Sequence, residues 1–201
     1  MEKNILLCGV GGQGTVLASK LIASAAMGMG EVVHSAETIG MAQRGGSVTS
    51  HVRIGEKAFS PLIPGGKADV LIAFEPAEAV RNLRYLSKSA TVIVNRIPVQ
   101  PVTESLGESH YDGEQMVAYL QEKCARVVVV DAAGLCEQIG SAKFFNVAIL
   151  GVAVGTGATG LDRDIVLREI ESRVPARFAD PNREAFLAGI RLAEQESTND
   201  K

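Results

Sequence analysis

The sequence predicts a single α/β domain of three layers, with a mainly parallel β-sheet covered by helices on both faces. Short apolar runs alternate along the chain with segments whose apolar residues recur at helical spacing, which is the order of strand–helix–strand units. The chain has 201 residues, the size of one such domain with a small appendage. Apolar residues make up 46% of the chain, which is ample for a core.

Each element is expected on local grounds. Strands are predicted where apolar residues form short continuous or alternating runs: Ile5–Cys8, Glu31–His34, Val48–Ile54, Val70–Phe74, Thr91–Asn95 and Val127–Val130. Helices are predicted where the apolar spacing is helical: Gly14–Met27, Pro76–Ser87, Glu114–Lys123, Ala132–Ile139, Val147–Val154, Asp164–Arg173 and Asn182–Gln195. Proline is tolerated in a first helical turn, so Pro76 marks a start, and Leu83 and Leu86 extend the apolar face of that helix.

The rest of the chain is expected to lack regular structure. The segment from Pro98 to Gly113 is rich in Pro, Ser and Gly and is predicted to be a loop. The last residues, 197–201, are predicted to form a disordered tail, so the domain is expected over residues 1–196.

Composition and charge exclude several functional classes. The net charge is −3, and no cluster of Lys and Arg is interleaved with aromatic residues, so neither nucleic acid nor a membrane surface is an expected partner. The three cysteines, Cys8, Cys124 and Cys136, form no C-x-x-C pair, so no disulfide framework, zinc site or iron–sulfur site is predicted on this chain. The N-terminus has no cleavage signature, and a cytoplasmic location is expected.

One uncharged stretch, from Phe144 to Leu161, approaches the lower length limit of a membrane-spanning helix. Its four glycines, together with Asn146 and two threonines, argue against a span. A buried helix that ends in a glycine-rich turn is expected instead.

A glycine-rich turn follows the first expected strand and leads into a helix. Glycine there allows a tight turn off the strand, close approach of the backbone to a phosphate and close packing of helix on strand, while the free N–H groups of the helix attract an anion. This Rossmann-like arrangement predicts a nucleotide or phosphate ligand near Gly9, Gly11, Gly12, Gln13 and Gly14. A purely structural glycine turn remains the alternative.

Two particular ligands of such a turn are disfavoured. A Walker-type loop needs a lysine after Gly14, where Thr15 and Val16 stand. A dinucleotide site needs a carboxylate about 20 residues beyond the glycines. His34 lies near that place and Glu37 comes slightly late, so conventional dinucleotide binding is not favoured.

A second candidate ligand segment lies between Glu37 and Gly55. Arg44 stands there beside Gly45, Gly46 and Ser47, which would allow charge-assisted hydrogen bonds to a phosphate or carboxylate. The alternative is a flexible loop whose arginine pairs with a surface carboxylate.

Other polar residues receive structural interpretations. Glu75 is expected either to stabilise a helix start or to line a ligand cleft at the carboxyl end of a strand. Glu78 and Arg81, three positions apart, are expected to form a solvated pair. Satisfied structural roles are expected for the scattered histidines His34, His51 and His110.

Several ordered blocks resemble the γ-type domain of the 2-oxoacid:ferredoxin oxidoreductases. They are GVGGQGTVLASKLIA, ETIGMAQRGGSVTSHVRIG, SPLIPGGKADVLIAFEPAEAVR and TVIVNRIPVQPV. The resemblance is nearly continuous from Asn4 to Asn95 and weaker through Val127–Ala132 and Asn146–Gly151. Within this family, the chain is most similar to the β subunits of the indolepyruvate-using members.

The resemblance implies a subunit of a complex that decarboxylates and oxidises a 2-oxoacid such as an aryl pyruvate, with coenzyme A as co-substrate and ferredoxin as electron acceptor. Thiamine diphosphate, magnesium and iron–sulfur clusters are expected on a larger α subunit, and ferredoxin is expected to interact through the complex. This chain lacks the G-D-G thiamine motif, since Tyr111 precedes Asp112 and Gly113, and it has too few cysteines for a cluster.

Coenzyme A is expected to contact the two glycine-rich segments, and no residue of this chain is assigned a catalytic or metal-binding role. A heterodimer or a dimer of heterodimers is expected. Two rival interpretations stay open: a free-standing NAD(P)-binding enzyme and a structural interaction module.

Overall fold

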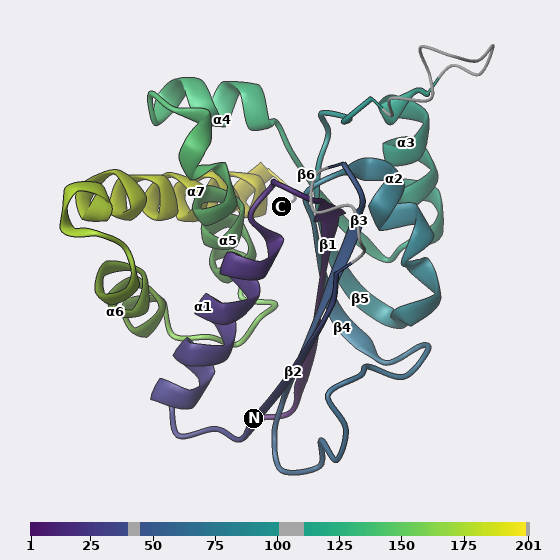
Figure 1. Ribbon diagram of the computed structural model, residues 1–201. Coiled ribbons are helices and arrows are strands. Elements are labelled where there is room, and N and C mark those ends of the chain that lie inside the picture. The colour runs from purple at the N-terminus through teal and green to yellow at the C-terminus, as the bar shows by residue number, and fades with distance from the viewer. Residues whose placement is uncertain (40–44, 101–110, 200–201) are drawn as a thin grey trace.

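A six-stranded mixed sheet lies between two layers of helices (Figure 1) in the computed structural model, which describes residues 1–39, 45–100 and 111–199. The strand order is β2-β3-β1-β4-β5-β6. The strands are Lys3–Val10 (β1), Val33–Ile39 (β2), Ser47–Ile54 (β3), Ala68–Ala73 (β4), Leu86–Asn95 (β5) and Arg126–Val130 (β6). β1, β4, β5 and β6 pair in parallel, and β3 is antiparallel to both of its neighbours. The predicted mainly parallel sheet is confirmed.

The helices lie on both faces of the sheet, as predicted. They are Thr15–Gly28 (α1), Pro76–Arg81 (α2), Gly113–Lys123 (α3), Ala132–Gln138 (α4), Phe145–Gly155 (α5), Arg163–Arg173 (α6) and Ala179–Asn199 (α7). Figure 1 shows α2 and α3 on one face and the other five on the opposite face. Side chains alternate along a strand, so Ile5 and Leu7 pack in the core with α1, while Leu6 and Cys8 pack in the core with α2.

The uncharged stretch is a core helix, as expected. Residues 147–154 of α5 are all buried, and α5 packs closely on α7 through Gly151 and Gly189. Within the described ranges, no single helix has the length and apolar character needed to cross a membrane. One pair of consecutive helical segments, Ala132–Gln138 and Ala142–Gly155, together has the length and composition of a membrane span. The two segments are bent by 113° relative to each other.

Two predicted boundaries are wrong. The helix expected over 76–87 ends at Arg81, and Leu86 instead begins β5, where it pairs with Ala68 of β4. Sheet pairing overrides helical spacing here because pairing depends on tertiary neighbours. The second strand begins at Val33 and continues to Ile39, forming a hairpin with β3 in which Val33 pairs with Ile54 and Ile39 with Val48.

The C-terminal helix is longer than expected. α7 begins at Ala179 and continues through Asn199, so its backbone includes part of the segment 197–201 that was predicted to be a disordered tail. Residues 200 and 201 lie outside the described ranges.

Candidate ligand-binding site

The connections after two adjacent parallel strands leave the sheet on opposite faces. β1 and β4 are paired from Ile5–Val70 to Cys8–Ala73. β1 leads into α1 on one face, and β4 leads into α2 on the other. Such a reversal opens a crevice beyond the carboxyl ends of the strands, where open α/β sheets bind ligands.

Both glycine-rich segments meet at this crevice. The Gly11 N–H donates to the carbonyl oxygen of Gly46 at 2.8 Å, and the Gly45 N–H donates to that of Gly11 at 3.3 Å. The turn after β1 and the tip of the β2–β3 hairpin are therefore joined by backbone hydrogen bonds. Arg44, the charged residue of the expected anion clamp, lies outside the described residues.

Two backbone donors predicted to meet a ligand are already engaged. The Gly11 N–H bonds the hairpin, and the Gln13 N–H donates to the carbonyl oxygen of Val10 at 3.1 Å. These two N–H groups close the turn and hold the neighbouring hairpin, and ligand binding by this segment stays a prediction.

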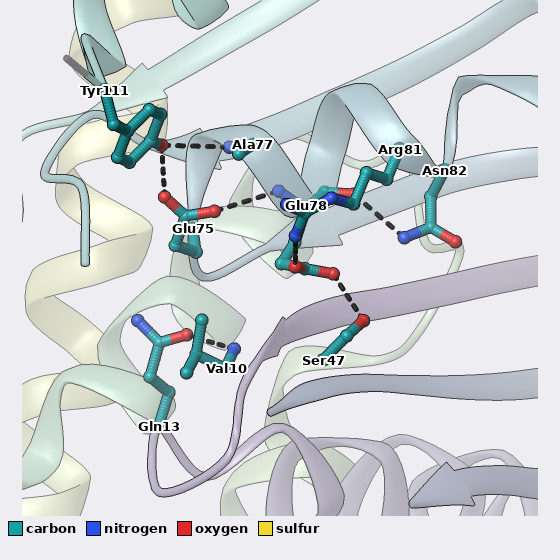
Figure 2. A network of polar contacts seen from close by, with 9 residues as sticks. All are labelled: Val10, Gln13, Ser47, Glu75, Ala77, Glu78, Arg81, Asn82 and Tyr111. Carbon is teal, nitrogen blue, oxygen red and sulfur yellow. Dashed lines mark hydrogen bonds and ion pairs between the residues drawn. The ribbon is translucent and has the colours of Figure 1, made fainter. Parts of the chain in front are cut away.

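The side chain of Gln13 fastens the turn to the sheet. Its Oε1 accepts the Val10 N–H at 2.7 Å (Figure 2), and its Nε2 donates to the carbonyl oxygen of Phe74 at 3.0 Å. Asn95 Nδ2 donates to the same carbonyl at 3.0 Å. The carboxyl ends of β1, β4 and β5 are thereby held together.

Replacing Gln13 with Ala is expected to lower the free energy of unfolding by about 2 kcal/mol, because the Val10 N–H and the Phe74 carbonyl lose their side-chain partner. Urea denaturation of the purified chain measures the change. Gln121→Ala, at an exposed position on α3, is the matched control and is expected to change stability little. Equal stabilities of the two variants would contradict the role given to Gln13.

The other glycines of the turn differ in what surrounds them. A side chain at Gly9 would place Cβ 2.9 Å from Cβ of Phe74, and one at Gly14 would lie 2.6 Å from Nδ2 of Asn146. Gly14 has φ of +84°, which favours glycine. Gly12 has φ of +105°, and nothing lies within 4 Å of the Cβ position there, so its surroundings are open.

The first turn of α1 borders a hollow of about 440 Å³. Its N-cap residue, Gly14, has no side chain to cap the helix. The N–H groups and the dipole of such a helix start favour an anion. The hollow is lined by Val10, Gly11, Gly12, Gly14, Thr15, Val16 and Val48.

Among the residues that the structure describes, no conventional dinucleotide arrangement lies beside this turn. The neighbour of β1 on that side is the antiparallel β3, whose residues nearest the glycines are Ser47 and Val48. In dinucleotide-binding folds this neighbour is parallel and carries a ribose-binding carboxylate. Glu37 lies one strand further out and accepts a hydrogen bond from Ser19 at 3.2 Å.

A second hollow, of about 360 Å³, lies between the hairpin and α2. Val10 lines both hollows. The second is lined by Val10, Gly45, Ser47, Glu75, Ala77, Glu78, Arg81, Val99, Gln100 and Tyr111. Figure 2 shows most of the polar groups around it.

Glu75 has the first of the two roles that the sequence predicts, stabilising a helix start, and the second, lining a ligand cleft, stays a prediction. It is the N-cap of α2, where Oε2 accepts the Glu78 N–H at 2.9 Å, and it also lines the second hollow. Its Oε1 accepts a hydrogen bond from the hydroxyl of Tyr111, and that hydroxyl accepts the Ala77 N–H at 3.2 Å. Burial raises the pKa of Tyr111 well above its usual range, and the hydrogen bond to the Glu75 carboxylate adds to the effect.

Glu78 does not form the solvated pair that was expected. Its side chain is 3% exposed, whereas that of its partner Arg81 is 65% exposed. Oε1 of Glu78 accepts a hydrogen bond from Arg81. Oε2 of Glu78 accepts a hydrogen bond from the Ser47 hydroxyl at 2.5 Å (Figure 2). Sequence spacing revealed only the contact within the helix, because the partner on β3 is 31 positions away.

The thiol of Cys8 is fully buried and lies near the carboxylates of Glu75 and Glu78. Burial raises its pKa far above the usual range, and the charges of Glu78 and Glu75 raise it further. A thiol in this state is chemically inert. Burial also raises the pKa values of Cys124 and Cys136.

The histidines have no catalytic partner in the part of the chain that the structure describes. His51 is buried, and its Nδ1 accepts the Ile63 N–H at 3.2 Å, which matches the structural role expected for it. Burial lowers its pKa. His34 is half-buried on β2, and His110 lies outside the described ranges. Over those same ranges, no group of three or more His, Cys, Asp or Glu side chains is placed to hold a metal ion.

The fold is shared with solved oxoacid oxidoreductases. The chain resembles the solved keto/oxoacid ferredoxin oxidoreductase γ subunit from Geobacter sulfurreducens, with a TM-score of 0.70 and 20% identity, covering 96% of this chain and 99% of that one. It also resembles 2-oxoglutarate:ferredoxin oxidoreductase from Magnetococcus marinus, with a TM-score of 0.69 and 19% identity, over 96% of this chain and 31% of that one. These similarities are similarities of fold.

Sequence comparison gives the family. The indolepyruvate oxidoreductase subunit IorB of Archaeoglobus fulgidus is 40% identical over 194 residues, which is 96% of each chain. Residues 4–192 match the pyruvate ferredoxin/flavodoxin oxidoreductase family, and the chain belongs to that family. The resemblance seen in the sequence is confirmed.

Proposed function

We propose that this chain is the β subunit, the one without thiamine or clusters, of an oxidoreductase that oxidises indolepyruvate or a related aryl pyruvate with coenzyme A and ferredoxin. The observation that carries the proposal is the 40% identity to the Archaeoglobus fulgidus subunit, which extends over 96% of both chains. The complex converts the 2-oxoacid and coenzyme A into acyl-CoA, carbon dioxide and a proton, and two electrons pass to oxidised ferredoxin.

The groups that carry out electron transfer belong to the larger α subunit in this proposal. The chain has three cysteines, fewer than a four-cysteine cluster needs, and their thiols have raised pKa values. Thiamine diphosphate, when bound on the partner, supplies the carbanion chemistry. The residues of this chain would bind and orient coenzyme A and help to exclude water from the active site.

The hollow at the start of α1 is the part of the site best suited to the diphosphate of coenzyme A. Gly12 leaves the backbone open there, Gly14 provides no side-chain cap for the helix, and the helix dipole favours a negative charge. The second hollow contains the carboxylates of Glu75 and Glu78, which would repel a phosphate. The structure of the Magnetococcus marinus neighbour has coenzyme A bound, which agrees with the proposal at the level of a shared fold.

Arg44→Ala is expected to raise the KM for coenzyme A about 10- to 100-fold in the assembled enzyme, because a charge-assisted hydrogen bond to the ligand is lost. Steady-state kinetics with varied coenzyme A measure the change. Arg168→Ala, on the exposed face of α6, is the control and is expected to leave the KM unchanged. An unchanged KM in Arg44→Ala would remove Arg44 from the binding site.

Purification of the tagged chain from its native host tests the subunit proposal. The expected result is co-purification of a larger thiamine- and cluster-binding chain, with dye reduction that depends on both indolepyruvate and coenzyme A. Varying the 2-oxoacid then determines the substrate. Recovery of the chain alone with measurable NAD(P) binding would support a free-standing enzyme. A complex whose coenzyme A kinetics are insensitive to changes in the glycine segments would support a structural module.

A further inference from the structure

The carboxylate of Glu78 is buried, yet α2 does not need it as a cap. The start of that helix is capped by Glu75, whose Oε2 accepts the Glu78 N–H. One oxygen of the Glu78 side chain contacts a residue outside α2, Ser47, which is the first residue of β3. A buried carboxylate is unfavourable unless it is paired, so its contacts must compensate for the loss of water.

The contact between Ser47 and Glu78 is a short hydrogen bond. The hydroxyl donates to Oε2 at 2.5 Å, a length typical of an O–H group bonded to a charged oxygen. The guanidinium of Arg81 pairs with Oε1, so both oxygens of the carboxylate have a donor. Glu78, whose side chain is buried, therefore holds the exposed residue Ser47 by a hydrogen bond at the second hollow.

Ser47 transmits this restraint to the glycine segments. It directly follows Gly45 and Gly46, whose backbone groups bond Gly11 in the turn before α1. A set of contacts thus runs from α2 through Glu78 and Ser47 to the turn that borders the hollow at the start of α1. Figure 2 shows its first part, the hydrogen bond between Glu78 and Ser47.

We propose that Glu78 is a positioning residue, whose buried carboxylate holds the start of β3 so that the hairpin tip and the turn before α1 keep the geometry that binds coenzyme A. The inference rests on the proposed function for the identity of the ligand. The position of the hairpin itself depends only on contacts within this chain.

The test uses four variants of this chain in the complex with its larger subunit. Glu78→Gln keeps the shape of the side chain but removes the charge. Ser47→Ala removes the hydroxyl from the other side of the contact, and Ser47→Thr restores it. Glu122→Gln, which removes an exposed carboxylate on α3, is the control for charge. Each variant is measured for KM, kcat and amide hydrogen exchange.

Glu78→Gln and Ser47→Ala are expected to raise the KM for coenzyme A about tenfold, with kcat and the KM for the 2-oxoacid changed less than about twofold. Hydrogen exchange is expected to accelerate in the peptide spanning residues 45–54 and not in α7. Ser47→Thr and Glu122→Gln are expected to resemble the wild type.

Three outcomes overturn one or the other inference. The first outcome is an unchanged KM for coenzyme A in both Glu78→Gln and Ser47→Ala, while the wild-type activity depends on coenzyme A. This outcome overturns the positioning role and leaves the proposed function intact. Parallel losses in kcat and faster exchange in α7 indicate a general structural role and also overturn it. If the wild-type complex does not use coenzyme A, the proposed function fails. Hydrogen exchange at residues 45–54 then decides by itself whether Glu78 holds the hairpin.

Discussion

Gly189→Ala is expected to lower the free energy of unfolding by about 3 kcal/mol or more. α5 and α7 pack so closely that a Cβ at Gly189 would overlap the carbonyl oxygen of Ala148 and lie 2.7 Å from Val152 N. These are backbone atoms in the buried part of α5, so the clash cannot be relieved by rotating a side chain. The two helices would have to separate, and the core contacts between them would be lost.

Thermal and urea unfolding of the purified chain measure this effect. Gly134→Ala, on α4, is the matched control because its Cβ would meet only the carboxylate end of Asp131, at 3.0 Å. Alanine is favoured over glycine inside a helix by about 1 kcal/mol, so this control is expected to be neutral or stabilising. Similar losses of stability in both variants would show that helix contact is not the cause.

Glu75→Ala is expected to destabilise the chain by about 2–4 kcal/mol, because one change removes the cap of α2 and a buried acceptor. The Glu78 N–H loses its side-chain partner, and the hydroxyl of Tyr111 loses the carboxylate. Glu75→Gln retains an acceptor oxygen of similar shape and is expected to lose less. Equal losses in the two variants would assign the effect to charge rather than to the cap.

The ionisation of Tyr111 gives a second measurement at the same site. Its pKa in the folded chain lies above the ordinary value of 10.0, because of burial and then the hydrogen bond to Glu75. The contribution of the Tyr111 hydroxyl to the free energy of unfolding is complete below pH 10.0 and is lost as the pH rises toward the pKa of the folded chain. The reason is that Tyr111 releases its proton at a lower pH in the unfolded chain than in the folded one. Glu75→Gln is expected to lower the pKa of Tyr111. Spectrophotometric titration of tyrosinate measures it, with Tyr111→Phe assigning the signal.

The sequence predicts elements well where the local pattern and the tertiary environment agree. The apolar run after Asn4 and the helical spacing after Gly14 require a buried strand and a helix in nearly any fold, and β1 and α1 lie there. The pattern fails at Leu86, which fits the apolar face of a helix but pairs with Ala68 in the sheet. Local spacing carries no information on such a pairing partner.

In the candidate site, too, some features can be predicted from the sequence and others depend on the tertiary structure. Glycines that allow close approach are visible in the sequence, and the two segments they mark do lie together. The direction of their N–H groups is not visible, and two of the donors expected to meet a ligand bond the chain itself. The spacing of Glu78 and Arg81 predicts a solvated pair, because that spacing is the same whether the helix face is exposed or buried.

The sequence by itself determined the α/β class, the order of most strands and helices, the family and the two glycine segments. These follow from periodicity, turn residues and the order of motifs, which are local properties of the chain. Only the tertiary structure decided that β3 runs antiparallel beside β1, that α5 and α7 touch through glycines, and that Glu78 holds Ser47. Each of these joins residues distant in the sequence, and burial and pairing energies depend on which surfaces meet in the folded chain.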